Sequence, residues 1–273
     1  MKTAGSAKST ARTYNAPLSR REVALLAAWE RERRLLVTLD DLRRAVGVDA
    51  APDVAWRLVR KKALERVGSG RYLVRPLRTQ SRPATPSVAV LAAALLQNEP
   101  YYLGGLWALT FHRLSEQQYG SVLDAFVAQR HPSRRLGGAR LTFHRVSPER
   151  LAYGTMAAGI EGISVQVSDP ERTLLDLLDF PALAGTADEG LRQARAALPK
   201  VSIPRIIEHA ARGSRTSTCQ RLGVLLERAG LPPRQLAPLR KRVRQTKSML
   251  SLRPGHPRVG PFNRRWGVVE NDR

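Results

Sequence analysis

Cationic side chains between residues 57 and 71 have the types and spacing to bind nucleic acid. Arginine makes forked hydrogen bonds to phosphate and to guanine edges, and lysine supplies a mobile positive charge. Arg57, Arg60 and Lys61 are spaced to share the outer face of one helix. The candidate DNA-binding residues are Trp56, Arg57, Arg60, Lys61, Lys62, Arg66 and Arg71. The alternative interpretation is a solvated helix face beside a hairpin.

The elements that would position these cations follow from local signals. Ser19 and Thr38 each stand three residues before a carboxylate, the spacing of a capping box, and Gly47 can end a helix. The turn Gly68-Ser69-Gly70 suits a hairpin. We therefore expect helices over 20–33 and 38–47, a strand at 35–37, a recognition helix over 52–65 and a hairpin ending at residue 74. This order is typical of a winged helix-turn-helix, whose recognition helix enters the major groove.

The charge of the chain is concentrated at its two ends. Among 273 residues there are 46 Lys and Arg against 23 Asp and Glu, a net charge of +23. Residues 1–82 hold 19 basic and 8 acidic side chains, residues 83–233 hold 16 and 13, and residues 234–273 hold 11 and 2. An arginine-rich genome would raise the charge uniformly, so this distribution favours two basic surfaces that meet a polyanion.

The C-terminal charge includes a second basic patch. Its residues are Arg240, Lys241, Arg242, Arg244 and Lys247, and no acidic residue lies between Arg228 and Glu270. Like charges at helical spacing repel each other unless an anion is present. We interpret the patch as a contact for DNA backbone, RNA or an acidic protein surface, with a solvated helix as the alternative.

A polar, proline-containing segment and the apolar patterns after it predict how the chain divides into domains. Residues 78–86 read RTQSRPATP, a polar, proline-broken segment of the kind that separates domains. Beyond it, apolar patterns predict helices at 88–96, 187–197, 203–212, 217–229 and 234–247, with strands at 122–129, 140–146 and 163–167. We expect an α/β or α+β protein with a disordered basic arm (1–18), a winged helix-turn-helix domain (19–77), a linker (78–86) and a mixed α/β domain with basic C-terminal helices (87–273).

The cysteine content and the length of the apolar runs indicate the cellular compartment. Cys219 is the only cysteine, so no disulfide can form within the chain, which fits a reducing, cytoplasmic environment. No apolar run reaches 18 residues, so we expect no membrane span.

Enzymatic chemistry has little support in the sequence. No phosphate-binding glycine loop, nucleophile elbow, HExxH or CxxC is present, and the five histidines are scattered. Asp169, Glu171 and Asp176 could serve as metal-binding carboxylates of a nuclease, but lysine is absent from residues 63–199. Helix capping by Asp169-Pro170-Glu171 accounts for the same residues without catalysis. We expect no catalytic residue, no metal and no cofactor.

Four features together resemble the AbiEi-type antitoxins of abortive-infection toxin–antitoxin pairs. They are the N-terminal winged-helix pattern, the Tyr-Tyr-Leu-Gly-Gly segment at 101–105, the strand-then-helix VSDPERTLLDLLDFP at 167–181, and Arg221-Leu222-Gly223 with Leu225-Leu226-Glu227, followed by Asn263 and Trp266. The resemblance covers about residues 20–270, and the 167–181 segment is its most specific part. The Arg-rich C-terminal stretch departs from the family pattern.

The resemblance implies a function and a partner. In that family the N-terminal domain represses its own operon at inverted repeats in double-stranded DNA. The C-terminal domain counters a nucleotidyltransferase-like toxin encoded alongside, without a stable complex in characterised systems. We therefore expect a DNA-binding antitoxin. The alternatives are a winged-helix transcription factor with a ligand-sensing or dimerising C-terminal domain and, less favoured, a metal-dependent nuclease.

Overall fold

The computed structural model describes residues 17–75, 77, 86–120, 122–136, 138–244 and 249–272. The chain divides into two compact units, residues 1–85 and 86–273. The expected basic arm and linker lie almost entirely outside the described residues, and so does Lys247. No helix in the described part of the chain is long and apolar enough to cross a membrane.

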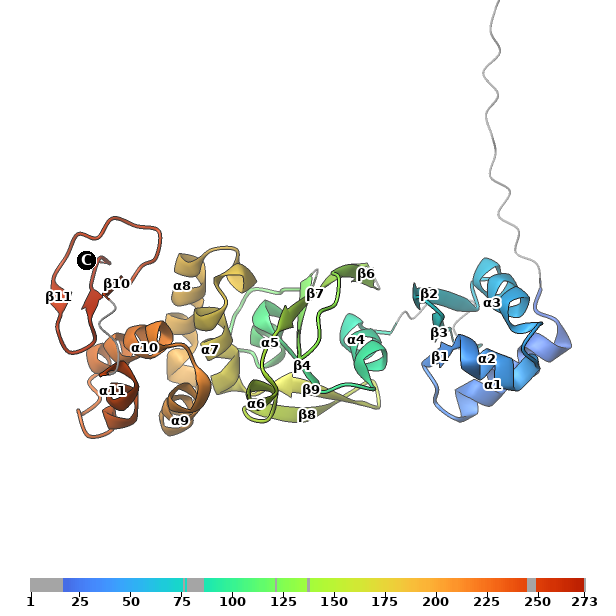
Figure 1. Cartoon of the computed structure of the whole chain (residues 1–273), viewed down its shortest axis with the longest axis horizontal. Helices are drawn as coiled ribbons and strands as arrows, with labels where there is room; N and C mark the ends of the chain where they lie inside the picture. The colour runs from blue at the N-terminus through green and yellow to red at the C-terminus, as the bar shows by residue number, and fades with distance from the viewer. Residues whose placement is uncertain are drawn as a thin grey trace, which may run out of the picture. The chain divides into compact units, whose positions relative to one another are not determined.

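The N-terminal unit consists of three helices and a small antiparallel sheet (Figure 1). Its elements are α1 (Arg20–Arg31), β1 (Leu36–Thr38), α2 (Leu39–Val46), α3 (Ala51–Arg60), β2 (Leu64–Gly68) and β3 (Arg71–Val74). The strand order is β1-β3-β2, and both pairings are antiparallel. The two capping boxes expected at Ser19 and Thr38 are present, and Gly47 ends α2 with a φ of 92°.

The helix expected over residues 52–65 is shorter than the sequence suggested. α3 ends at Arg60 because the chain turns at Lys62, whose φ is 58°. The amide of Ala63 donates to the carbonyl of Leu58 and that of Lys62 to Val59, the pair of bonds that closes a helix through a left-handed residue. The buried residues that follow then enter β2, so Lys61 and Lys62 do not continue the helical face.

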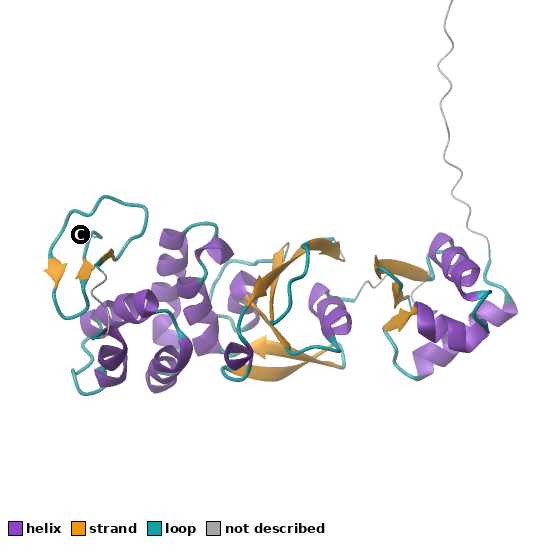
Figure 2. Ribbon diagram, viewed as in Figure 1, coloured by secondary structure: helices purple, strands orange, loops and turns teal. Residues whose placement is uncertain are grey.

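The second unit is built around a mixed six-stranded sheet (Figure 2). The strand order is β6-β7-β5-β4-β9-β8. The strands are β4 (Tyr101–Gly104), β5 (Val122–Val127), β6 (Arg134–Leu136), β7 (Ala139–Arg145), β8 (Thr155–Ile160) and β9 (Ile163–Ser168). β4 pairs in parallel with β9 and β5 with β7, whereas the other three pairings are antiparallel. The two edge strands, β6 and β8, were not anticipated, and neither was β4.

Helices cover the sheet and continue beyond it to the C-terminus. They are α4 (Val88–Leu96), α5 (Gly105–Phe111), α6 (Pro148–Leu151), α7 (Pro170–Asp179), α8 (Ala187–Ala197), α9 (Ile203–Gly213), α10 (Thr216–Arg228) and α11 (Ala237–Val243), with 3-10 turns η2 (Pro181–Ala184) and η3 (Leu198–Lys200). The mixed architecture that ends in helices is confirmed. The end itself is not purely helical, because β10 (Leu250–Ser251), β11 (Phe262–Asn263) and β12 (Val268–Val269) form a small sheet.

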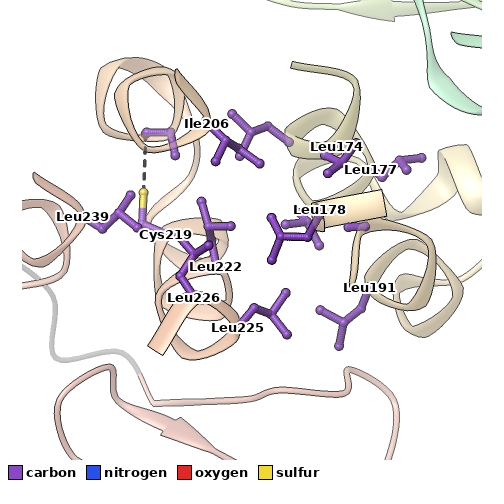
Figure 3. Close-up of a cluster of buried hydrophobic side chains, with 14 of the residues drawn as sticks. Leu174, Leu177, Leu178, Leu191, Ile206, Cys219, Leu222, Leu225, Leu226 and Leu239 are labelled. Atoms are coloured by element: carbon purple, nitrogen blue, oxygen red, sulfur yellow. Dashed lines mark hydrogen bonds between the residues drawn. The ribbon is translucent and has the colours of Figure 1, made fainter. Parts of the chain in front are cut away.

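The core of the helical part is a leucine cluster (Figure 3). Side chains from α7, α8, α9, α10 and α11 meet there, and they include Leu174, Leu178, Leu191, Ile206, Leu222 and Leu239. Cys219 is buried among them and donates to the carbonyl of Ala210 at 3.5 Å. Burial raises the pKa of the Cys219 thiol to about 11, so it packs as a neutral side chain.

Beside this apolar cluster lies a buried ion network at the start of α7. Arg172, which is 1% exposed, donates to Asp176 at 2.8 Å and to the hydroxyl of Tyr102 at 2.9 Å. Burial opposes the charge of Arg172, but Asp176 and the tyrosines Tyr102 and Tyr153 outweigh it and raise the pKa. The guanidinium therefore stays charged and ties α7 to β4.

The same network reaches the helical layer through Arg150 of α6. Its guanidinium donates to Asp179 at 2.6 Å, to Asp176 at 3.3 Å and to the carbonyl of Gly213 at 2.8 Å. Asp179 also accepts from the amide of Arg215 and the hydroxyl of Thr218, before and within α10. One set of charges thus joins the sheet, α7 and the α9–α10 junction.

Replacing Arg172 should strongly destabilise the protein. Arg172→Leu leaves Asp176 buried with fewer donors, and removing one partner of a buried pair costs about 3–5 kcal/mol. The matched control is Arg192→Ala, since Arg192 pairs with Glu189 on an exposed helix face. We expect urea denaturation to show a much lower midpoint for Arg172→Leu and an unchanged one for Arg192→Ala. Equal midpoints for the two variants would contradict the role assigned to the network.

Candidate nucleic-acid interfaces

The outer face of α3 carries the first group of candidate residues. Trp56 is 59% exposed, and the guanidinium of Arg60 lies 4.7 Å from the centre of its ring. Arg57 is exposed next to them, while Val54, Ala55 and Leu58 of the same helix are buried. Trp29, by contrast, is a core residue of the N-terminal unit. An exposed tryptophan with a stacked arginine offers a flat surface and a positive charge to a ligand.

Lys61 does not share that outer face. Its ammonium group lies 2.7 Å from a carboxylate oxygen of Glu22 in α1, and its side chain is only 16% exposed. Arg57 lies 3.7 Å from the other oxygen of Glu22 but remains 48% exposed. Nothing in the sequence connects residues 39 positions apart. Lys61 joins α1 to α3 and does not share the outer face with Arg57 and Arg60, and its contact with DNA stays a prediction.

Glu22 is the carboxylate that both Lys61 and Arg57 approach. Burial would raise its pKa, but hydrogen bonds from Lys61 and from the amide and hydroxyl of Ser19 hold the pKa below its ordinary value. The ion pair therefore contributes stability above the ordinary pKa of a glutamate, and this stability is lost as the pH falls through the lower folded value.

The remaining candidates lie around the β2–β3 hairpin. Lys62 is exposed in its left-handed position after α3. Arg66 is exposed and donates to the carbonyl of Gly68 at 3.3 Å, which holds its side chain along the turn. Arg71 begins β3, opposite Gly68, and is half-buried. Lys62 and Arg66 are thus better exposed for a phosphate contact than Lys61 or Arg71.

In the second basic patch, some side chains are exposed to solvent and others hydrogen-bond to the protein backbone. Lys241 of α11 and Arg244, the residue directly after α11, are exposed. Arg242 is half-buried and donates to the carbonyl of Ser214 at 3.2 Å, so it helps to fix α11 against the end of α9. Arg240 donates to the carbonyl of Arg265 at 2.8 Å. The outward surface therefore contains Arg240, Lys241 and Arg244 of the predicted residues.

Two hollows border this part of α11. One, of about 290 Å³, is lined by Arg240, Arg244, Met249, Phe262, Arg264 and Arg265 together with Gln220, Val243, Trp266 and Gly267. The other, of about 520 Å³, is lined by Arg240, Lys241, Arg244 and Arg265 with Pro233, Leu236 and Ala237. Sequence reasoning missed Met249, Phe262, Arg264 and Arg265, although the long acid-free stretch that contains them was a signal.

The carboxylates considered for a metal are bound by protein groups. Asp169 caps α7 and accepts from the amide of Arg172, from Arg205 and from His209. Glu171 accepts from the amide of Ser202 at 2.8 Å. In the described part of the chain, no group of three or more His, Cys, Asp or Glu side chains is arranged to hold a metal ion. The capping account of this segment is the one that its geometry supports.

Comparison with known proteins shows a likeness in fold. No family model matches the chain, and no curated protein does. Among solved structures, the crystal structure of the Rv2827c protein from Mycobacterium tuberculosis superimposes with a TM-score of 0.63 at 19% sequence identity. The match covers 93% of this chain and 92% of that chain. The fold of this chain therefore resembles that of Rv2827c over nearly its whole length.

Adding a methyl group at Gly223 should disturb the C-terminal basic surface. A Cβ there would lie 2.3 Å from the ring of Trp266, which is fully buried against α10. Because overpacking of a filled core costs about 1–3 kcal/mol, Gly223→Ala should lower the urea midpoint. Gly159→Ala is the control, since a Cβ at Gly159 meets nothing within 4 Å. An unchanged midpoint for Gly223→Ala would show that Trp266 is not fixed as described.

Proposed function

We propose that this chain is a non-enzymatic, DNA-binding antitoxin that represses its own operon. The exposed face of α3, with Trp56, Arg57 and Arg60, is the observation that carries the DNA-binding half of the proposal. The order of helices and strands around it supports a winged helix-turn-helix, in which α3 enters the major groove and the β2–β3 hairpin is the wing. The target is double-stranded DNA at promoter inverted repeats.

The antitoxin half rests on the sequence resemblance of residues 101–105, 167–181, 221–227, 263 and 266. In the structure these residues all lie in the second compact unit, where they form two packed groups. Tyr102 and the 167–181 segment share the buried ion network, and Gly223, Glu227, Asn263 and Trp266 pack together at the C-terminal end. We infer that residues 86–273 counter a nucleotidyltransferase-like toxin, and that the partner is encoded by the adjacent gene.

Base reading is assigned to Arg57, which lies nearer the start of α3 than Arg60. Arg57→Ala should cost about 1–3 kcal/mol on the operator and relax base preference at one position of each half-site. Lys62→Ala should weaken operator and random duplex equally, because its expected contact is a phosphate. Competition titrations of both variants, with Arg31→Ala as an exposed control on α1, measure this. If Arg57→Ala lowers both affinities by the same factor, Arg57 does not read bases.

Lys61 now serves as an internal control for this assignment. Lys61→Ala leaves Glu22 buried beside the more distant Arg57, so it should lower the thermal midpoint of the N-terminal unit. Its effect on DNA should follow that loss of folded protein, and the salt dependence of binding should keep the wild-type slope. A shallower salt dependence of DNA binding at an unchanged thermal midpoint would show that Lys61 contacts DNA.

The two activities should separate along the chain. Expression of residues 86–273 should abolish repression of the native promoter and still rescue growth when the adjacent toxin gene is co-expressed, because these residues form their own compact unit. Full-length Arg57→Ala/Arg60→Ala is the matched variant, since it weakens DNA binding without removing chain. A folded 86–273 fragment that gives no rescue would contradict the division. Absence of a nucleotidyltransferase-like neighbour would favour a transcription factor instead.

A further inference from the structure

The two hollows beside α11 share part of their cationic lining. Both are lined by Arg240, Arg244 and Arg265, and the larger one adds Lys241 while the smaller one adds Arg264. The surface therefore presents five cations from α11 and from the turn after β11. We call it the α11 groove.

The turn that carries Arg264 and Arg265 is firmly held. Trp266 occupies the space left by Gly223, and its indole N–H donates to Glu227 at 2.9 Å. Glu227 also accepts from the side chains of Asn263 and Arg265. Trp266 and Glu227 thus hold the turn, and Phe262 and Arg264 are exposed at the rim of the α11 groove.

The cations of the groove are only partly neutralised by the protein. Glu227 pairs with Arg265, but Arg244 and Arg264 have no carboxylate partner among the residues that the structure describes. Arg240 is partly desolvated beside Arg244 and Arg265, and burial and these two neighbours together lower its pKa. Converging like charges of this kind are stabilised when an anion binds between them.

Apolar surface lies directly beside these charges. Phe262 is 46% exposed and Met249 is 54% exposed, and both line the smaller hollow. A double helix keeps its base faces stacked inside, so it offers phosphates to the cations and nothing to the phenyl ring. A single strand offers phosphates and free base faces together, the combination bound by proteins that pair basic grooves with exposed aromatic rings.

We propose that the α11 groove binds single-stranded nucleic acid, with Arg240, Arg244 and Arg264 at the phosphates and Phe262 stacked on a base. An acidic protein surface would be recognised by the cations but would leave the exposed phenyl ring without a matching partner. This inference does not rest on the proposed antitoxin function, because it concerns a surface far along the chain from α3 and a different form of nucleic acid.

The test uses the full chain carrying Arg57→Ala and Arg60→Ala, so that the α3 face contributes little. Fluorescence anisotropy would measure binding to labelled 12-nucleotide oligo-U, to oligo-dT and to a 12-base-pair duplex. Adding Arg244→Ala and Arg264→Ala should weaken both single strands about tenfold or more. Adding Phe262→Ala instead should weaken both single strands about tenfold or more and change the duplex about twofold at most, because only a single strand offers a base to the ring. Tighter binding of oligo-U than of oligo-dT would identify RNA as the preferred strand.

Two controls make the result specific. Phe262→Tyr keeps a ring that can stack and should retain the starting affinity, which separates stacking from misfolding. Arg258→Ala removes an exposed arginine that does not line either hollow and should change nothing. Equal losses on duplex and single strand for Phe262→Ala, or single-strand affinity unaffected by all groove variants, would overturn the proposal.

Discussion

The buried pair of Arg172 and Asp176 is the constraint on which the second unit depends. Two charges in an apolar interior are stable only when every donor and acceptor around them is engaged. Tyr102 from the sheet hydrogen-bonds to both charges, and Arg150 from α6 donates to Asp176. Asp179 from α7 in turn accepts from Arg150. The leucine cluster could tolerate small shifts between helices, whereas hydrogen-bonded charges require one arrangement. The network therefore fixes how the helical layer sits against the sheet.

Local signals predicted much of the fold. Capping residues, glycine stops and apolar periodicity placed α1, α2, α7, α8 and α9 close to their observed bounds, because a helix start depends on neighbours only three residues away. β6 and β8 were missed for the opposite reason. Each is an edge strand that exists through pairing with its neighbour, and an edge strand carries little apolar alternation of its own.

The candidate sites, too, could be predicted only where they depend on neighbouring residues in the sequence. Exposure of Arg57 and Arg60 on α3 agrees with what helical spacing suggested. The pairing of Lys61 with Glu22 did not follow from spacing, since it links separate helices. At the C-terminal end the sequence showed an excess of arginine, but only the fold of Trp266 against Gly223 brings Phe262 and Arg264 to the same groove as α11. Long-range contacts of this kind leave no periodic trace in a sequence.

The internal pairing of cations changes what the count of 46 Lys and Arg residues means for binding. Arg172 and Arg150 are neutralised by buried aspartates, Arg228 by Glu270 and Asp272, and Lys61 by Glu22. Such residues displace no counterions from a polyanion, because their charges are already compensated within the protein. The number of cations that can meet a nucleic acid is thus smaller than the 46 Lys and Arg residues of the chain, and it is set by the shape of each surface. A sequence with the same composition but differently placed carboxylates would be an equally basic protein and a different binder.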